Sequence, residues 1–216
     1  MKNKSLVVIS LLVLVAIFVG ASVFFKQSQS SSVEKITGDV RSIPFVRDHS
    51  VKFGEDNRKV VLVEFIDPSC APCGQFSRIV KKIHSEYEGD IQIVIRYLAK
   101  FKDSPYVVKI LEASRKQDKF PEVLDVIFQK QHLWGNYNNP KPMLIWDYLK
   151  NVEGLDLTKL KNEVEVIDIS KVLKLDKKDA DILGVRGTPT VFVNGIRLQT
   201  LSYQTLDDLV ISQIYK

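Results

Sequence analysis

Two cysteines three positions apart, Cys70 and Cys73, are the residues of this sequence best suited to chemistry. The C-x-x-C spacing favours a redox-active dithiol, because one thiolate attacks a partner and the second thiol then resolves the mixed disulfide. Two alternatives stay open: a structural disulfide, or half of a zinc site. A zinc site usually needs four ligands, and the candidates His49, His84 and His132 show no ligand spacing. We therefore expect no bound metal.

The pair is positioned by a predicted strand before it and a predicted helix after it. Residues 60–66 form a Val-rich apolar run that is typical of a buried strand, and residues 72–87 have apolar side chains at helical spacing. Cys70 then lies at a helix N-terminus, where unpaired N–H groups and the helix dipole lower a thiol pKa from about 8.5. We expect Cys70 to be the nucleophile and Cys73 the resolving thiol.

The remaining pattern predicts an α/β fold. The order strand, helix, strand indicates a right-handed parallel unit. The other predicted elements are, in chain order, a strand at 91–98, mostly helical structure at 104–183, a strand at 190–193, a hairpin turn at 194–195, a strand at 196–198 and a helix at 203–215.

An apolar run at residues 6–25, preceded by Lys2 and Lys4, indicates the cellular compartment. About 20 apolar residues suffice to cross a bilayer as a helix, and the preceding lysines favour a cytoplasmic N-terminus. We expect a single-pass anchor in the cytoplasmic membrane, with the folded body on the extracytoplasmic, periplasmic side. The alternative is a cleaved signal peptide with a small-residue site at 19–21. Both interpretations place the folded domain outside the cytoplasm.

The expected organisation has three parts. Residues 1–26 comprise the cytoplasmic N-terminus and the anchor, residues 27–42 a Ser/Gln-rich tether, and residues 43–216 the folded domain. The net charge is +5, but the basic residues are scattered among acidic ones without interleaved aromatic side chains. We therefore expect no nucleic-acid binding.

Three segments resemble the DsbA-like branch of the thioredoxin superfamily. They are residues 61–65, the C-x-x-C that begins five residues after Phe65, and residues 184–195. The resemblance implies a thioredoxin fold with an inserted helical domain, which the long helical stretch at 104–183 fits. The chain also resembles a bacterial subgroup with an N-terminal membrane helix, in which a Trp and an Asn-Pro-x-Pro segment occur as at Trp134 and 139–142.

The resemblance also implies roles for Thr188 and Pro189. The bond between them is expected to be cis, with Pro189 against the two cysteines. Thr188 then offers its backbone to an extended substrate strand. The ordinary alternative is a trans proline that begins an edge strand.

Glu64 interrupts the apolar strand six residues before Cys70. Strand alternation permits a solvent-facing charge, whereas the resemblance implies a buried acid that assists proton transfer at Cys73. Burial would raise its pKa toward neutrality. For Arg96, in the second strand, the alternatives are an ion pair with Glu64 and a place on the surface.

We expect a thiol–disulfide oxidoreductase that acts on exported proteins, works with a membrane redox partner and needs no cofactor. The DsbA-like architecture and the oxidising compartment favour a dithiol oxidase. The best-known oxidases have Pro-His between the cysteines, whereas this chain has Ala71 and Pro72 and lacks that cation. A reductase or isomerase fed by a membrane electron donor therefore stays open, as does a metal-binding chaperone.

Overall fold

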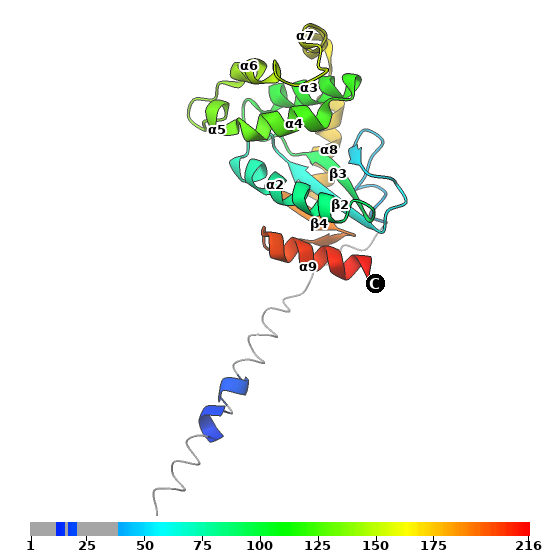
Figure 1. Ribbon diagram of the computed structural model, residues 1–216, viewed down its shortest axis with the longest axis vertical. Helices are drawn as coiled ribbons and strands as arrows, with labels where there is room; N and C mark the ends of the chain where they lie inside the picture. The colour runs from blue at the N-terminus through cyan, green and yellow to red at the C-terminus, as the bar shows by residue number, and fades with distance from the viewer. Residues whose placement is uncertain (1–11, 16, 21–38) are drawn as a thin grey trace, which may run out of the picture. The chain divides into compact units, whose positions relative to one another are not determined.

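The computed structural model describes residues 12–15, 17–20 and 39–216 (Figure 1). The chain divides into two units, 1–35 and 36–216. In the first unit, residues 12–15 and 17–20 are helical and exposed. Among the described residues, no helix has the length and apolar character needed to cross a membrane. The expected anchor and tether lie largely outside the described residues.

The second unit is built on a five-stranded sheet with the strand order β1-β3-β2-β4-β5. Strands β2 and β3 are parallel, and the other neighbouring pairs are antiparallel. The strands are β1 (Val51–Phe53), β2 (Val60–Ile66), β3 (Ile91–Tyr97), β4 (Thr190–Val193) and β5 (Ile196–Arg197). The α/β fold is thus confirmed, and β1 is the strand that the sequence pattern did not predict.

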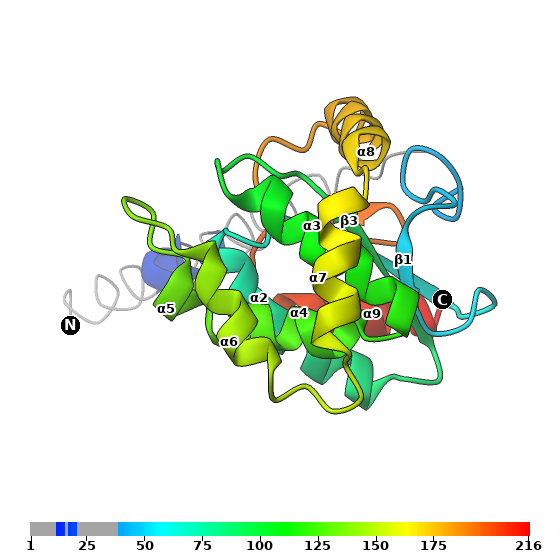
Figure 2. The same cartoon turned by 90° about the horizontal axis from the view of Figure 1, so that it is seen from above.

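The helical stretch expected between the two halves of the sheet is confirmed. Figure 1 shows α3 to α7 gathered above the sheet and α9 at the opposite end, and in Figure 2 α7 lies across α3, which it contacts. The helices are α2 (Ala71–Glu86), α3 (Ser104–Ser114), η1 (Arg115–Gln117), α4 (Phe120–Gln129), α5 (Gln131–Trp134), η2 (Pro142–Leu144), α6 (Ile145–Leu149), α7 (Leu157–Val166), α8 (Ser170–Ile182) and α9 (Tyr203–Ile214).

Both faces of β2 are covered, so every residue of this strand is buried. Leu62 and Ile66 belong to the core shared with α2, α9 and the helical insertion. Val63 and Phe65 point to the other face, where the second core includes Leu183 beyond α8. Because strand side chains alternate, Glu64 shares the face of Leu62 and Ile66.

The predicted hairpin turn between β4 and β5 is confirmed. Asn194 and Gly195 have φ values of 47° and 79°, the left-handed region that a two-residue turn of this type requires. The Asn194 side chain accepts a hydrogen bond from the N–H of Val61 (2.9 Å) and donates one to the carbonyl of Lys59 (3.1 Å). The hairpin is thereby fixed to the start of β2.

Arg96 is neither on the surface nor paired with Glu64, so both expectations for it are wrong. In the parallel register Arg96 lies opposite Phe65, and Glu64 lies opposite Ile95. Arg96 therefore points to the other face of the sheet, toward α8. There its Nη2 donates to Asp176 (2.7 Å) and Asp179 (2.6 Å).

Candidate functional site

The turn between β2 and α2 is held by the buried carboxylate of Asp67. It accepts hydrogen bonds from the backbone N–H of Ser69 (2.9 Å) and Lys100 (2.6 Å), and from the hydroxyl of Ser104 (2.5 Å). The segments that follow β2 and β3 are thereby tied together beside Cys70. Sequence reasoning missed this residue, because Lys100 and Ser104, two of these three partners, lie more than 30 positions away.

A second clamp on the turn comes from Gln131 at the start of α5. Its buried amide donates to the carbonyl oxygens of Pro68 (2.8 Å) and Cys70 (3.0 Å). Gly74 makes room for it, since a Cβ there would approach Gln131 Oε1 to 2.5 Å. The helical insertion therefore reaches the active-site turn directly, which no local sequence pattern indicated.

The two cysteines are free thiols at the N-terminus of α2, as the sequence predicts. Cys70 is the N-cap residue and Cys73 lies one turn inside, where its N–H donates to the Cys70 carbonyl (3.0 Å). The hydrogen bond from the Cys73 thiol, against the opposing effect of burial, lowers the pKa of Cys70 to about 6. Burial, together with the neighbouring Cys70, raises the pKa of Cys73. The pair thus divides into a ready thiolate and a protonated thiol.

Thr188, which precedes Pro189, lies against Cys70. The peptide bond between Thr188 and Pro189 is cis, and the carbonyl oxygen of Thr188 is 3.2 Å from Cys70 Sγ. Pro189 is buried, whereas Thr188 is partly exposed. The fold therefore brings residues 118 positions apart in the sequence into contact with the nucleophile.

Glu64 is buried on the α2 side of the sheet, with 2% of its surface exposed. Burial raises the pKa of Glu64 to about 8, and its charge contributes to the raised pKa of Cys73. Its Oε1 has no hydrogen-bond partner among the described residues. The acid is thus protonated at neutral pH and lies close enough to Cys73 to influence its pKa. Its role in proton transfer stays a prediction.

The raised pKa of Glu64 predicts a specific dependence of stability on pH. The unfolded chain releases this proton near pH 4.5, whereas the folded chain keeps it until about pH 8. The free energy of unfolding should therefore fall as pH rises from about 4.5 to about 8. Glu64→Gln removes this titration. The free energy of unfolding of the variant minus that of the wild type should therefore be about 3 kcal/mol more favourable at pH 7 than at pH 4.

Urea unfolding of both reduced proteins at pH 4, 5.5 and 7 measures this difference. Cys70 and Cys73 are present in both, so their titration cancels in the comparison. Glu122→Gln, at an exposed position of α4, is the matched control and should show no such trend. A stability difference for Glu64→Gln that stays constant across this range would contradict a buried, protonated Glu64.

An open hollow of about 910 Å³ adjoins Cys70. Phe101, after β3, and Tyr137, in the loop after α5, form one wall with their rings edge to face at 5.9 Å. Tyr137 is 82% exposed, and Lys100 and Lys102 also line the hollow. The hollow therefore carries aromatic and basic side chains beside Asp103, and it is partly lined by Pro140 and Pro142 of the Asn-Pro-x-Pro segment.

Within residues 12–15, 17–20 and 39–216, no three His, Cys, Asp or Glu side chains gather as a metal site would need. Besides each other, the groups that act on Cys70 and Cys73 are Glu64, Asp67 and the carbonyl oxygen of Thr188. The expectation that no metal is bound stays a prediction.

Comparison of the sequence with known proteins identifies a matching family and several related proteins. The family model described as Thioredoxin matches residues 47–211. A probable disulfide bond formation protein D from Bacillus cereus is 29% identical, over 66% of this chain and 68% of that protein. A Na(+)/H(+) antiporter NhaA from Herminiimonas arsenicoxydans is 25% identical over 68% of this chain, which spans only 22% of that protein's length.

Solved structures show the same fold at low sequence identity. Oxidised BdbD from Bacillus subtilis matches with a TM-score of 0.70 and 20% identity, covering 84% of this chain and 99% of that one. DsbA from Chlamydia trachomatis matches with a TM-score of 0.66 and 15% identity, covering 81% and 96%. These chains therefore share the overall fold of this one.

Proposed function

The chain belongs to the thioredoxin family, in its DsbA-like branch of thiol–disulfide oxidoreductases, and on this premise we propose that it oxidises dithiols of exported proteins through Cys70 and Cys73. The observation that supports this most directly is the difference between the pKa values of the two thiols. Cys70 is a low-pKa thiol at the N-terminus of α2, whereas Cys73 is buried and protonated.

The proposed reaction begins with the Cys70–Cys73 disulfide. A substrate thiolate attacks Cys70 Sγ, which forms a mixed disulfide and expels Cys73 as a thiolate. That thiolate takes the proton of Glu64. The second substrate thiolate then attacks the substrate sulfur of the mixed disulfide and expels the Cys70 thiolate. The substrate has lost two electrons to the cysteine pair, which a membrane redox partner must reoxidise.

Thr188 contributes to the same step by its position. Its carbonyl oxygen faces Cys70 Sγ at 3.2 Å, at the edge that an incoming extended segment would occupy. The aromatic wall of Phe101 and Tyr137 lies in the hollow beside the nucleophile. We propose that a partly unfolded polypeptide, with an apolar side chain near its cysteine, fills this surface.

The direction of exchange follows from how strongly the reduced pair is stabilised. A stabilised Cys70 thiolate favours the dithiol form, and this makes the pair a stronger oxidant. The pKa of Cys70, about 6, supports an oxidase. Ala71 and Pro72 offer no cation or side-chain donor, which is the feature that favours the reductase or isomerase alternative.

The reduction potential tests this proposal. We expect a value between about −120 mV, for the Pro-His oxidase DsbA, and about −270 mV, for thioredoxin. Replacing Ala71-Pro72 by Pro-His should raise the potential, because an added cation stabilises the thiolate. Equilibration of the domain 39–216 and its variant with glutathione buffers measures both values. A native potential as high as that of DsbA, or no change after the swap, would show that the dipeptide does not set the potential.

We further propose that residues 6–25 anchor the domain on the outer face of the cytoplasmic membrane. The apolar run and the preceding lysines support this topology. The body should stay with the membrane fraction and be digested by protease added to intact spheroplasts. A body that resists protease until lysis would refute the topology, and a body released into the soluble periplasm would favour cleavage at 19–21.

A further inference from the structure

A cavity of about 220 Å³ lies beneath α2, between this helix, the sheet and α4. Most of its walls are apolar, including the side chains of Ile66 from β2, Ile93 from β3 and Phe128 from α4. The volume is many times the roughly 10–15 Å³ that one water molecule needs by the same kind of measure. The cavity therefore has room for several water molecules wherever polar atoms hold them.

Two buried polar atoms without hydrogen-bond partners belong to residues that line this cavity. They are Glu64 Oε1 and His84 Nε2, and among the described residues only one further buried side-chain atom, Arg58 Nε, lacks a partner. Buried polar groups are rarely left unpaired in native proteins. Water in the cavity would satisfy both atoms, and it would place the carboxyl and the imidazole on one hydrogen-bonded path.

The cavity leads toward the protein surface. A smaller hollow of about 60 Å³ shares Ser77, Lys81 and Asp125 with it. Lys81 of α2 and Asp125 of α4 form an ion pair at this point, and Lys81 is exposed. The path from Glu64 therefore ends at charged groups in contact with solvent, on the side of α2 that carries His84.

We propose that this cavity is the route by which Glu64 exchanges its proton with solvent, and that His84 is a positioning residue that relays the proton through water. The inference rests on the proposed function. When the Cys73 thiolate takes the proton of Glu64, a carboxylate is left in a buried site and must be reprotonated. Direct contact with solvent is closed to it, because Glu64 is only 2% exposed.

The surroundings of His84 suit such a relay. Burial, helped by Arg58, lowers the pKa of its imidazole, while Glu88 opposes this shift. Lys81 on its own helix, Asp125 on α4 and Glu64 on β2 are the other charged or titratable groups at the cavity. A neutral imidazole both accepts and donates a proton near pH 7, which is the property that a relay needs.

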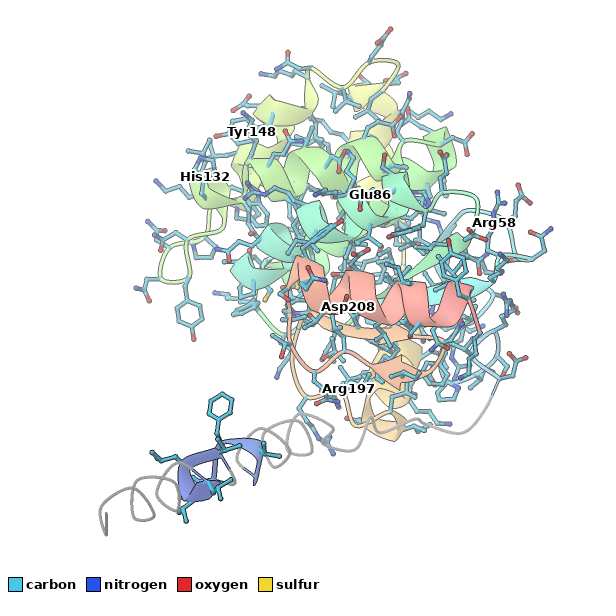
Figure 3. All side chains as sticks on the ribbon, turned by 60° about the horizontal axis from the view of Figure 1, so that its bottom comes forward. Arg58, Glu86, His132, Tyr148, Arg197 and Asp208 are labelled. Atoms are coloured by element: carbon cyan, nitrogen blue, oxygen red, sulfur yellow. The ribbon has the colours of Figure 1, made fainter. Side chains whose placement is uncertain are left out.

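The experiment compares His84→Ala and His84→Gln with His132→Ala in the oxidation of the reduced Cys70–Cys73 pair by oxidised glutathione, in which Glu64 must release its proton to solvent before it can accept the proton of Cys73. His132 is exposed on α5, away from the cavity lining, and Figure 3 shows it at the outer edge of the helical insertion. We expect both His84 variants to slow the reaction at least tenfold near pH 7, within the range of general acid–base effects. Added imidazole should restore His84→Ala, whose cavity has space for it, but not His84→Gln.

A second measurement does not depend on activity. The carboxyl band of Glu64, identified in the infrared spectrum by its loss in Glu64→Gln, should shift more slowly after mixing with D₂O in His84→Ala. Leu124→Trp, which fills the cavity from α4, should slow it as well. An unchanged rate and pH profile in both His84 variants, with an active wild type, would overturn the relay. A wild type whose reduced pair is not oxidised by glutathione would instead overturn the proposed function.

Discussion

Cys70→Ser is expected to reduce thiol–disulfide exchange to the rate of the uncatalysed reaction, whereas Cys73→Ser is expected to trap mixed disulfides with substrates that contain a disulfide. The difference follows from the positions of the two thiols. Cys70 faces Thr188 and the open hollow, and its lowered pKa of about 6 keeps it ionised at neutral pH. Cys73 is fully buried beside Cys70, so its loss removes the thiol that would release Cys70 from a mixed disulfide formed with a substrate disulfide.

Thiol oxidation of a reduced model substrate measures the first outcome, and non-reducing gel electrophoresis after incubation with a disulfide-containing substrate measures the second. The double variant Cys70→Ser/Cys73→Ser is the control, and it should form no mixed disulfide. Ser69→Ala, which keeps both cysteines, should retain exchange because only its hydroxyl contact with Asp103 is lost. Full activity of Cys70→Ser would refute the mechanism.

The elements around this site were predictable where the sequence signal is local. The apolar run of β2, the helical spacing of α2 and the Asn194-Gly195 turn each specify their structure within a few residues. β1 was missed because it has only three residues, and because its pairing with β3 is made across some 40 positions. Short strands take their stability from neighbours rather than from their own pattern.

The roles of the two cysteines were predictable from the sequence, but the residues that fix the turn around them were not. Asp67 and Gln131 fix the turn through partners more than 30 and 60 residues away. Their residue types are common on surfaces, so only the fold shows that they are buried. The face of Arg96 was likewise set by strand register, which alternation within β3 alone does not reveal.

Asp176 shows why the partners of Arg96 were not predicted. In the sequence it interrupts the apolar side of α8 and weakens the prediction of that helix. In the structure it is buried, accepts hydrogen bonds from Arg96 and from the N–H of Tyr97 (2.7 Å), and lies 2.6 Å from His49. A polar residue on an apolar face was thus the sign of a buried ionic network.

That network leads to the second large effect, on stability. Arg96 is fully buried, and its five N–H donors meet Asp176, Asp179 and the carbonyl oxygens of Pro44 and Phe45. It therefore connects β3, α8 and the segment before β1. Burial alone would raise the pKa of Asp179, but the hydrogen bonds from Arg47 and Arg96 outweigh it and lower this pKa.

Arg96→Leu should lower the free energy of unfolding by about 3–5 kcal/mol, because it leaves two buried carboxylates with too few partners. Arg186→Leu is the matched control. This arginine is exposed, and its ion pair with Asp181, at 3.4 Å, is also on the surface, so its loss should lower the free energy of unfolding by less than about 1 kcal/mol. Urea unfolding at pH 7 measures both. Since unpaired carboxylates in the variant should regain protons, its deficit should shrink as pH is lowered toward 5. If Arg96→Leu lowers the free energy of unfolding no more than Arg186→Leu does, the ionic network does not hold α8 against β3.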